Sequence, residues 1–142
     1  MHPGHEEADL FRVGSTRPRQ FVAYGQKVYK LKDLLGTIHD GRQVPQTSSA
    51  LVAAAVFFCG LLRIRSFNAL EPRLSERPYM RLVGVPEETA RLCSVDTVSR
   101  VLRGVDLATV RDLGVQMVAR AERNKVFREG WHRAMRYVAL DG

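Results

Sequence analysis

The run Ala50-Leu51-Val52-Ala53-Ala54-Ala55-Val56-Phe57-Phe58-Cys59-Gly60-Leu61-Leu62 decides the fold of this chain. It is apolar on every side of a helical projection, which is typical of a helix at the centre of a bundle. Thr47 or Ser48 offers an N-cap, and Arg63 and Arg65 suit the negative end of the helix dipole, so a helix is expected over 50–64. The run is too short to cross a bilayer, which takes about 20 apolar residues.

Further helices are expected around this centre, from apolar spacing and from residues that begin or end helices. These helices are expected at 26–38, at 66–70 with an interruption at Pro72, in a segment that begins at Pro78, at 86–92 and at 95–103. A long helix is expected from Asp106 to about Glu129. In the long helix the inner stripe is expected to be Leu107, Val110, Met117 and Ala121, with basic side chains outside. A strand is expected at 136–140, where a continuous apolar run is typical of a strand covered on both faces.

These segments divide the chain into three parts. Residues 1–25 carry Gly, Pro and basic residues without periodicity and are expected to form a loose basic tail. Residues 26–130 form a helical domain, and residues 131–142 begin a second domain with the strand. The fold class expected is therefore mainly α, a helical bundle that ends in a β-strand.

Composition favours a globular, nucleic-acid-binding protein. The 142 residues are 45% hydrophobic and 26% charged, and the net charge is +7, mostly from arginine. Arginine-rich basicity favours phosphate partners, although solubility alone would also explain it. The two cysteines, Cys59 and Cys93, form no CxxC pair, so we expect a reduced cytoplasmic protein without a zinc site. No signal peptide or membrane segment is visible.

The segment Ser94-Val95-Asp96-Thr97-Val98-Ser99-Arg100-Val101-Leu102-Arg103 predicts an N-capped amphipathic helix. Val95, Val98, Val101 and Leu102 are expected inside, and Asp96, Thr97, Ser99, Arg100 and Arg103 outside. A DNA-recognition helix needs this division between a packing face and a polar, basic face. The run 97–102 resembles the recognition helix of helix-turn-helix repressors of the lac type, with 86–92 as the preceding helix. The alternative is a bundle helix whose arginines are merely solvated.

The last residues, Tyr137-Val138-Ala139-Leu140-Asp141-Gly142, place a carboxylate directly after the expected strand. A carboxylate on such a rigid element suits a magnesium ligand in phosphoryl transfer. One carboxylate cannot hold two metals, and an Asp-Gly turn leading into a hairpin is the common alternative.

Taken together, the two motifs resemble the N-terminal region of the insertion-sequence DDE transposases. That region carries a Ser-x-Asp-Thr-φ-x-Arg-φ helix, a φ-Asp that begins a long helix, and a φ-Ala-φ-Asp-Gly strand, where φ is apolar. This chain has Ser94, Asp96, Thr97, Val98, Arg100 and Val101, then Val105-Asp106, and finally Val138-Ala139-Leu140-Asp141-Gly142. The resemblance covers about the C-terminal third of the chain.

The resemblance implies that 131–142 begins a ribonuclease-H-like catalytic domain whose first of three acids, a ligand for Mg²⁺, is Asp141. The partner acids are absent from this chain, so it is expected to be a truncated, catalytically incomplete part, with Mg²⁺ needed only by the intact enzyme. The implied partner is double-stranded DNA with terminal inverted repeats, contacted by Thr97, Ser99, Arg100 and Arg103. A homo-oligomer is a further possibility.

Two other functions are compatible with the sequence. A stand-alone helix-turn-helix transcriptional regulator would account for Arg100 and the basic charge, but it would leave the terminal apolar strand unpaired. A purely structural bundle acting through protein contacts would have no affinity for DNA at low salt. Affinity for DNA therefore separates the first two functions from the third.

Overall fold

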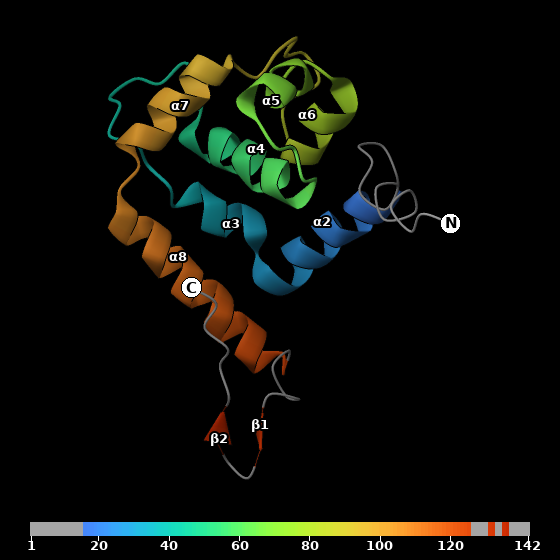
Figure 1. The fold of residues 1–142 in the computed structure, drawn as a ribbon, viewed down its shortest axis with the longest axis vertical. Coiled ribbons are helices and arrows are strands. Elements are labelled where there is room, and N and C mark those ends of the chain that lie inside the picture. The colour runs from blue at the N-terminus through green and yellow to red at the C-terminus, as the bar shows by residue number, and fades with distance from the viewer. Residues whose placement is uncertain (1–15, 126–130, 133–134, 137–142) are drawn as a thin grey trace.

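A computed structural model describes residues 16–125, 131–132 and 135–136, and this part of the chain is mainly helical (Figure 1). The elements are α2 (Thr16–Tyr29), α3 (Leu31–Gly36), α4 (Ser49–Leu61), α5 (Phe67–Arg73), α6 (Arg77–Val83), α7 (Val95–Gly104), α8 (Leu107–Arg123), β1 (Trp131–His132) and β2 (Met135–Arg136). None of the helices described is long and apolar enough to cross a membrane.

Helix α4 lies at the centre, as its all-apolar sequence predicts. Val52 and Ala55 are fully buried, and the helix packs against α3, α6 and α7. The Tyr79 hydroxyl of α6 donates a 2.6 Å hydrogen bond to the Ala55 carbonyl oxygen, which satisfies the only polar atom of that buried side chain. The helix ends at Leu61, before the predicted Ile64, because Arg63 takes a left-handed conformation with φ 54°.

The predicted single helix over 26–38 is two helices. Lys30 has φ 53° and separates α2 from α3, and the Gln26 side-chain oxygen accepts from the Lys32 amide at 2.9 Å. Residues 16–25, predicted as part of a loose tail, belong to α2 instead. Pro18 lies in the first turn of α2, where a helix needs no amide donor, and its ring is buried, so tertiary packing orders a segment without apolar periodicity.

Around α5 and α6 one prediction holds and two do not. Helix α6 begins with Pro78 in its first turn and buries Met80, as predicted. Helix α5 continues through Pro72 to Arg73, although the proline removes one amide donor from the helix. Residues 86–92, predicted as a helix, form a turn, and the Leu92 amide donates to the Leu74 carbonyl oxygen at 2.9 Å. This segment is held against the end of α5 and forms no helix, so it does not supply the predicted partner helix of a helix-turn-helix.

Helices α7 and α8 begin where the sequence predicts, at Ser94 and Asp106, and each cap side chain accepts from backbone amides of its first turn. Leu102, predicted inside, is exposed. Helix α8 ends at Arg123 rather than near Glu129. Most of its first half is exposed: Leu107 is 71% exposed, whereas Leu113 packs against the core. The inner stripe predicted for α8 packs only in its second half because α2, its main helical neighbour, lies there.

Strands β1 and β2 pair antiparallel, with Trp131 opposite Arg136 and His132 opposite Met135. Of the predicted strand over 136–140 only Arg136 is described, within β2. The other positions, 137–140, lie outside the described residues, and so does most of 131–142, the segment expected to begin a ribonuclease-H-like domain.

Candidate nucleic-acid interface

The start of α7 is held by two side chains that accept from its first amides. Ser94 Oγ accepts from the Thr97 amide at 3.3 Å, and Glu71 Oε2 of α5 accepts from the Val95 amide at 2.8 Å. Glu71 also pairs with the Arg91 guanidinium. These bonds satisfy amide groups that a helix leaves unpaired at its start, and they fix the first turn of α7 relative to α5.

The rotation of α7 about its axis is set by its inner face and its last residue. Val98 and Val101 are fully buried in the core. At the other end, a Cβ atom on Gly104 would lie 2.7 Å from the Asp40 carbonyl oxygen, so the backbone of the loop after α3 rests directly against α7. As a consequence Arg100 and Arg103 face solvent.

The loop between α3 and α4 is organised by Asp40. Its carboxylate accepts from Ser49 Oγ at 2.9 Å and pairs with the Arg42 guanidinium, while Arg42 Nη2 donates to the Thr47 carbonyl oxygen at 2.9 Å. Burial would raise the pKa of Asp40, but the hydrogen bonds from Ser49 and Arg42 and the charge of Arg42 hold it below the ordinary value. The buried carboxylate is therefore ionised and neutralised by Arg42.

This loop and α7 together line a polar pocket of about 300 Å³. The lining residues are two arginines, three neutral hydrogen-bonding residues and two apolar loop residues: Arg42, Arg100, Gln46, Thr47, Thr97, Val44 and Pro45. Arginine forks fit phosphate oxygens and guanine edges, and Thr and Gln side chains can contact either phosphates or base edges. No acidic residue lines the pocket, so the arrangement suits an anionic, hydrogen-bonding ligand.

The pocket brings together some of the sequence-predicted DNA-binding residues and not others. Thr97 and Arg100 line it, whereas Ser99 is half-buried outside it and Arg103 is exposed in the last turn of α7. Asp141, predicted as a catalytic acid and magnesium ligand, lies outside the described residues. Arg120, one of the basic residues predicted on the exterior of the long helix, donates to the Tyr29 carbonyl oxygen and so ties α8 to α2.

Sequence reasoning missed the loop residues Arg42, Gln46 and Thr47. For this loop the sequence predicts only an N-cap for the following helix, at Thr47 or Ser48. An arginine beside hydrogen-bonding residues just before a helix start could have indicated a binding loop. That this loop lies against α7 depends on a contact between distant segments, which the sequence does not show.

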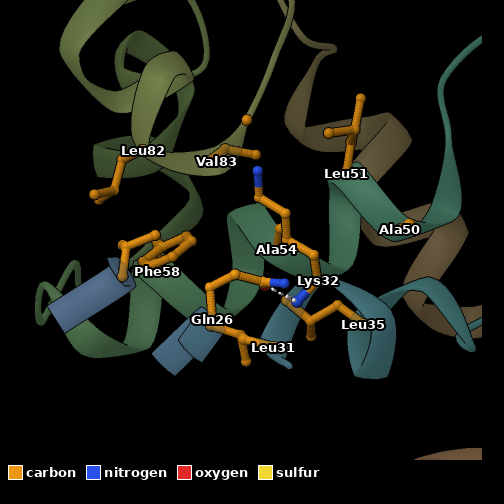
Figure 2. A pocket seen from close by; sticks show the side chains of 12 residues that line it. Gln26, Leu31, Lys32, Leu35, Ala50, Leu51, Ala54, Phe58, Leu82 and Val83 are labelled. Atoms are coloured by element: carbon orange, nitrogen blue, oxygen red, sulfur yellow. Dashed lines mark hydrogen bonds between the residues drawn. The ribbon is translucent and has the colours of Figure 1, made fainter. Parts of the chain in front are cut away.

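A second pocket, of about 160 Å³, lies among α2, α3, α4 and α6 (Figure 2). It is lined mainly by apolar side chains such as Leu31, Ala54 and Phe58, and Lys32 reaches along it towards Val83. Gln26, its other large polar residue, already bonds the Lys32 amide. The lining holds no carboxylate, histidine or cysteine, so it offers no acid–base pair for catalysis.

Within the described ranges, no group of three or more His, Cys, Asp or Glu residues could hold a metal ion. No protein-family model, no curated protein and no solved structure matches this chain.

Proposed function

We propose that this chain binds double-stranded DNA through the outward side of α7 and the adjoining loop 41–48. The observation that carries the proposal is the polar pocket in which Arg42 and Arg100 meet Thr47 and Thr97 from two distant segments. Its walls are held by buried contacts on both sides, from Asp40 and from the core face of α7. A preformed site of this kind loses little conformational freedom when it binds a ligand.

The chemistry of the pocket fits a phosphate or a base edge. Arg100 is exposed, and the guanidinium of Arg42 compensates the one carboxylate buried beneath the loop. The net charge of +7 adds a long-range attraction for a polyanion. Arg42 is occupied by Asp40 and Thr47, so Arg100 is the arginine of the pocket that can contact a phosphate and position the protein on DNA, and the neighbouring Thr and Gln side chains can read bases in the major groove.

The wider proposal is that the chain is the DNA-binding part of an insertion-sequence DDE transposase that acts on terminal inverted repeats. It is supported by the resemblance of Ser94, Asp96, Thr97, Val98, Arg100 and Val101 to the family's helix. The residue pair Val105-Asp106 fits the same pattern, because Asp106 caps the long helix α8. The stand-alone helix-turn-helix regulator is less well supported, since 86–92 forms a turn.

The test is a fluorescence anisotropy titration of a duplex of about 20 base pairs at low and moderate salt. We expect Arg100→Ala plus Arg103→Ala to weaken binding at least about tenfold and to make the affinity less dependent on salt. The matched control, Arg19→Ala plus Arg65→Ala, removes the same charge from two exposed positions elsewhere and should change the affinity by less than about threefold.

If the two double variants bind DNA with equal affinity, α7 is not part of the interface, and binding depends only on the overall charge of the chain. If the unmodified chain has no affinity for duplex DNA at low salt, the DNA-binding proposal is wrong, and a structural bundle that acts through protein contacts would take its place.

A further inference from the structure

Helix α8 presents a large apolar surface that the rest of the described chain leaves uncovered. Leu107, Val110, Met117 and Val118 lie on one side of the helix, and Ala121 is the one α8 residue that is buried. Val118 is 45% exposed, and a Cβ atom on Gly114 would meet nothing within 4 Å. Exposed apolar surface of this kind on a helix marks an interaction site more often than chance.

The second half of this surface forms one wall of an apolar groove of about 390 Å³, whose other wall is α2. The side chains that shape it are Phe21, Tyr24, Tyr29, Phe57, Met117 and Val118. The Tyr24 and Tyr29 rings meet edge to face, with centroids 6.2 Å apart, and the Arg120 bond to the Tyr29 carbonyl oxygen holds the two helices together. Figure 1 shows α8 converging on α2 along this side of the molecule.

Basic residues of α2 lie along one rim of the groove. Helix α2 carries no acidic residue, and Arg17 and Lys27 are exposed, whereas Arg19 lines a different hollow together with Pro78. Arg17 lies one turn before Phe21 and Lys27 one turn after Tyr24, so both flank the aromatic side chains. Helix α8 contributes less positive charge: it carries three arginines and the two acidic residues Asp112 and Glu122, and Arg120 is already bonded to the Tyr29 carbonyl oxygen.

We propose that the groove between α2 and α8 binds an acidic amphipathic helix of a partner protein. Apolar anchors at spacings of three or four residues would enter the groove, and carboxylates on the flanks of that helix would face Arg17 and Lys27. Helix α8, with 17 residues, is about 25 Å long and can support a partner helix of about five turns.

The charge distribution favours this occupant over two others. A second copy of the chain would bring its own positive rim against this one, which costs free energy at a net charge of +7. Nucleic acid would place phosphates against a lining of aromatic and aliphatic side chains, which offer no donors for them. A partner helix with an apolar face and acidic flanks is complementary both to the apolar lining of the groove and to its basic rim.

The experiment uses the full chain and a fluorescein-labelled helical peptide of about 18 residues, with leucines on one face and glutamates elsewhere. A second peptide replaces every glutamate by glutamine. Val118→Asp places a charge in the groove, and Val115→Asp is the matched control, because Val115 is on the same helix, 68% exposed and outside the groove lining. Circular dichroism confirms that both variants fold.

We expect the glutamate peptide to bind with a dissociation constant below about 100 μM and Val118→Asp to weaken it at least about tenfold. Val115→Asp should change it less than about twofold, and the glutamine peptide should bind several-fold more weakly at low salt. Lys27→Glu, which leaves the apolar lining intact, should also weaken the glutamate peptide.

Four results would each overturn the proposal. They are absence of binding to the glutamate peptide, equal binding to both valine variants, displacement of the peptide by duplex DNA, and a mass doubling in solution that Val118→Asp abolishes. Displacement by DNA would assign the groove to nucleic acid, and the mass doubling would assign it to a second copy.

Discussion

Among single residues, Asp40 connects three separate structural features. Its carboxylate joins Ser49 at the start of α4 to Arg42 in the loop, and its carbonyl oxygen lies against Gly104 of α7. A change at Asp40 therefore reaches the loop, the central helix and the candidate interface at once. Nothing in the local sequence around Asp40 distinguishes it from an ordinary loop aspartate.

We expect Asp40→Asn to lower the free energy of unfolding by about 1–3 kcal/mol at pH 7, because Arg42 loses its charged partner. The folded-state pKa of Asp40 lies below the ordinary value of 3.8, so its contribution is complete above that pH and is lost as the pH falls through the folded pKa. The stability difference between wild type and Asp40→Asn should therefore shrink below about pH 4. Urea unfolding from pH 7 to pH 3 measures it.

Asp112→Asn is the control for this titration, because Asp112 is exposed on α8. A stability difference for Asp40→Asn that stays constant down to pH 3, or that matches the Asp112→Asn difference, would mean that the buried pair contributes nothing measurable.

At the scale of the element, two helical glycines have opposite surroundings. Gly104 ends α7 against the backbone of Asp40, whereas Gly114 lies in the middle of α8 with open space around it. From helix propensity alone, replacing either glycine by alanine is expected to stabilise the helix. The tertiary contact at Gly104 reverses that expectation.

We expect Gly104→Ala to destabilise the protein by about 1–3 kcal/mol, because the added methyl group would overlap a backbone oxygen that cannot move alone. Gly114→Ala should stabilise it by up to about 1 kcal/mol through helix propensity. Thermal and urea unfolding of the two variants check both signs. A stabilised Gly104→Ala variant would show that α7 and the loop before α4 are not in contact.

At the scale of the whole molecule, stability is unevenly distributed. The core is built on α4, with Leu70, Tyr79 and Val98 fully buried around it from three other helices. Helix α8 buries Ala121 alone and leaves most of its first half exposed. Helices with little buried surface open at a lower free energy than helices in the core.

Hydrogen exchange of the isolated chain should follow this order. Amides in the middle of α4 should exchange only by global unfolding, and those in the first half of α8 should exchange at least about a hundredfold faster. The measurement is native-state exchange read by NMR or mass spectrometry. Equal protection of α4 and α8 would indicate that α8 is covered in solution, for example by a second copy of the chain.

The sequence by itself determined the local features of the protein. The all-apolar run over 50–62 predicted a central helix, and Ser94 and Asp106 predicted the starts of α7 and α8, since caps and periodicity depend on neighbours within a few residues. The part of the candidate interface that α7 supplies was also predictable, because Thr97 and Arg100 lie on the outer face of an amphipathic helix. The DNA-binding and transposase functions drawn from these residues stay predictions.

Tertiary structure decided what depends on contacts between distant segments. The turn at 86–92 held by Leu74 and the exposure of Leu107 follow from which surface lies opposite, which no periodicity encodes. Arg42 lies at the candidate interface because the contact between Asp40 and Gly104 brings its loop against α7. Side-chain caps such as Ser94 and Asp106 act on neighbours in the sequence, whereas burial requires a partner surface, and only the folded chain supplies one.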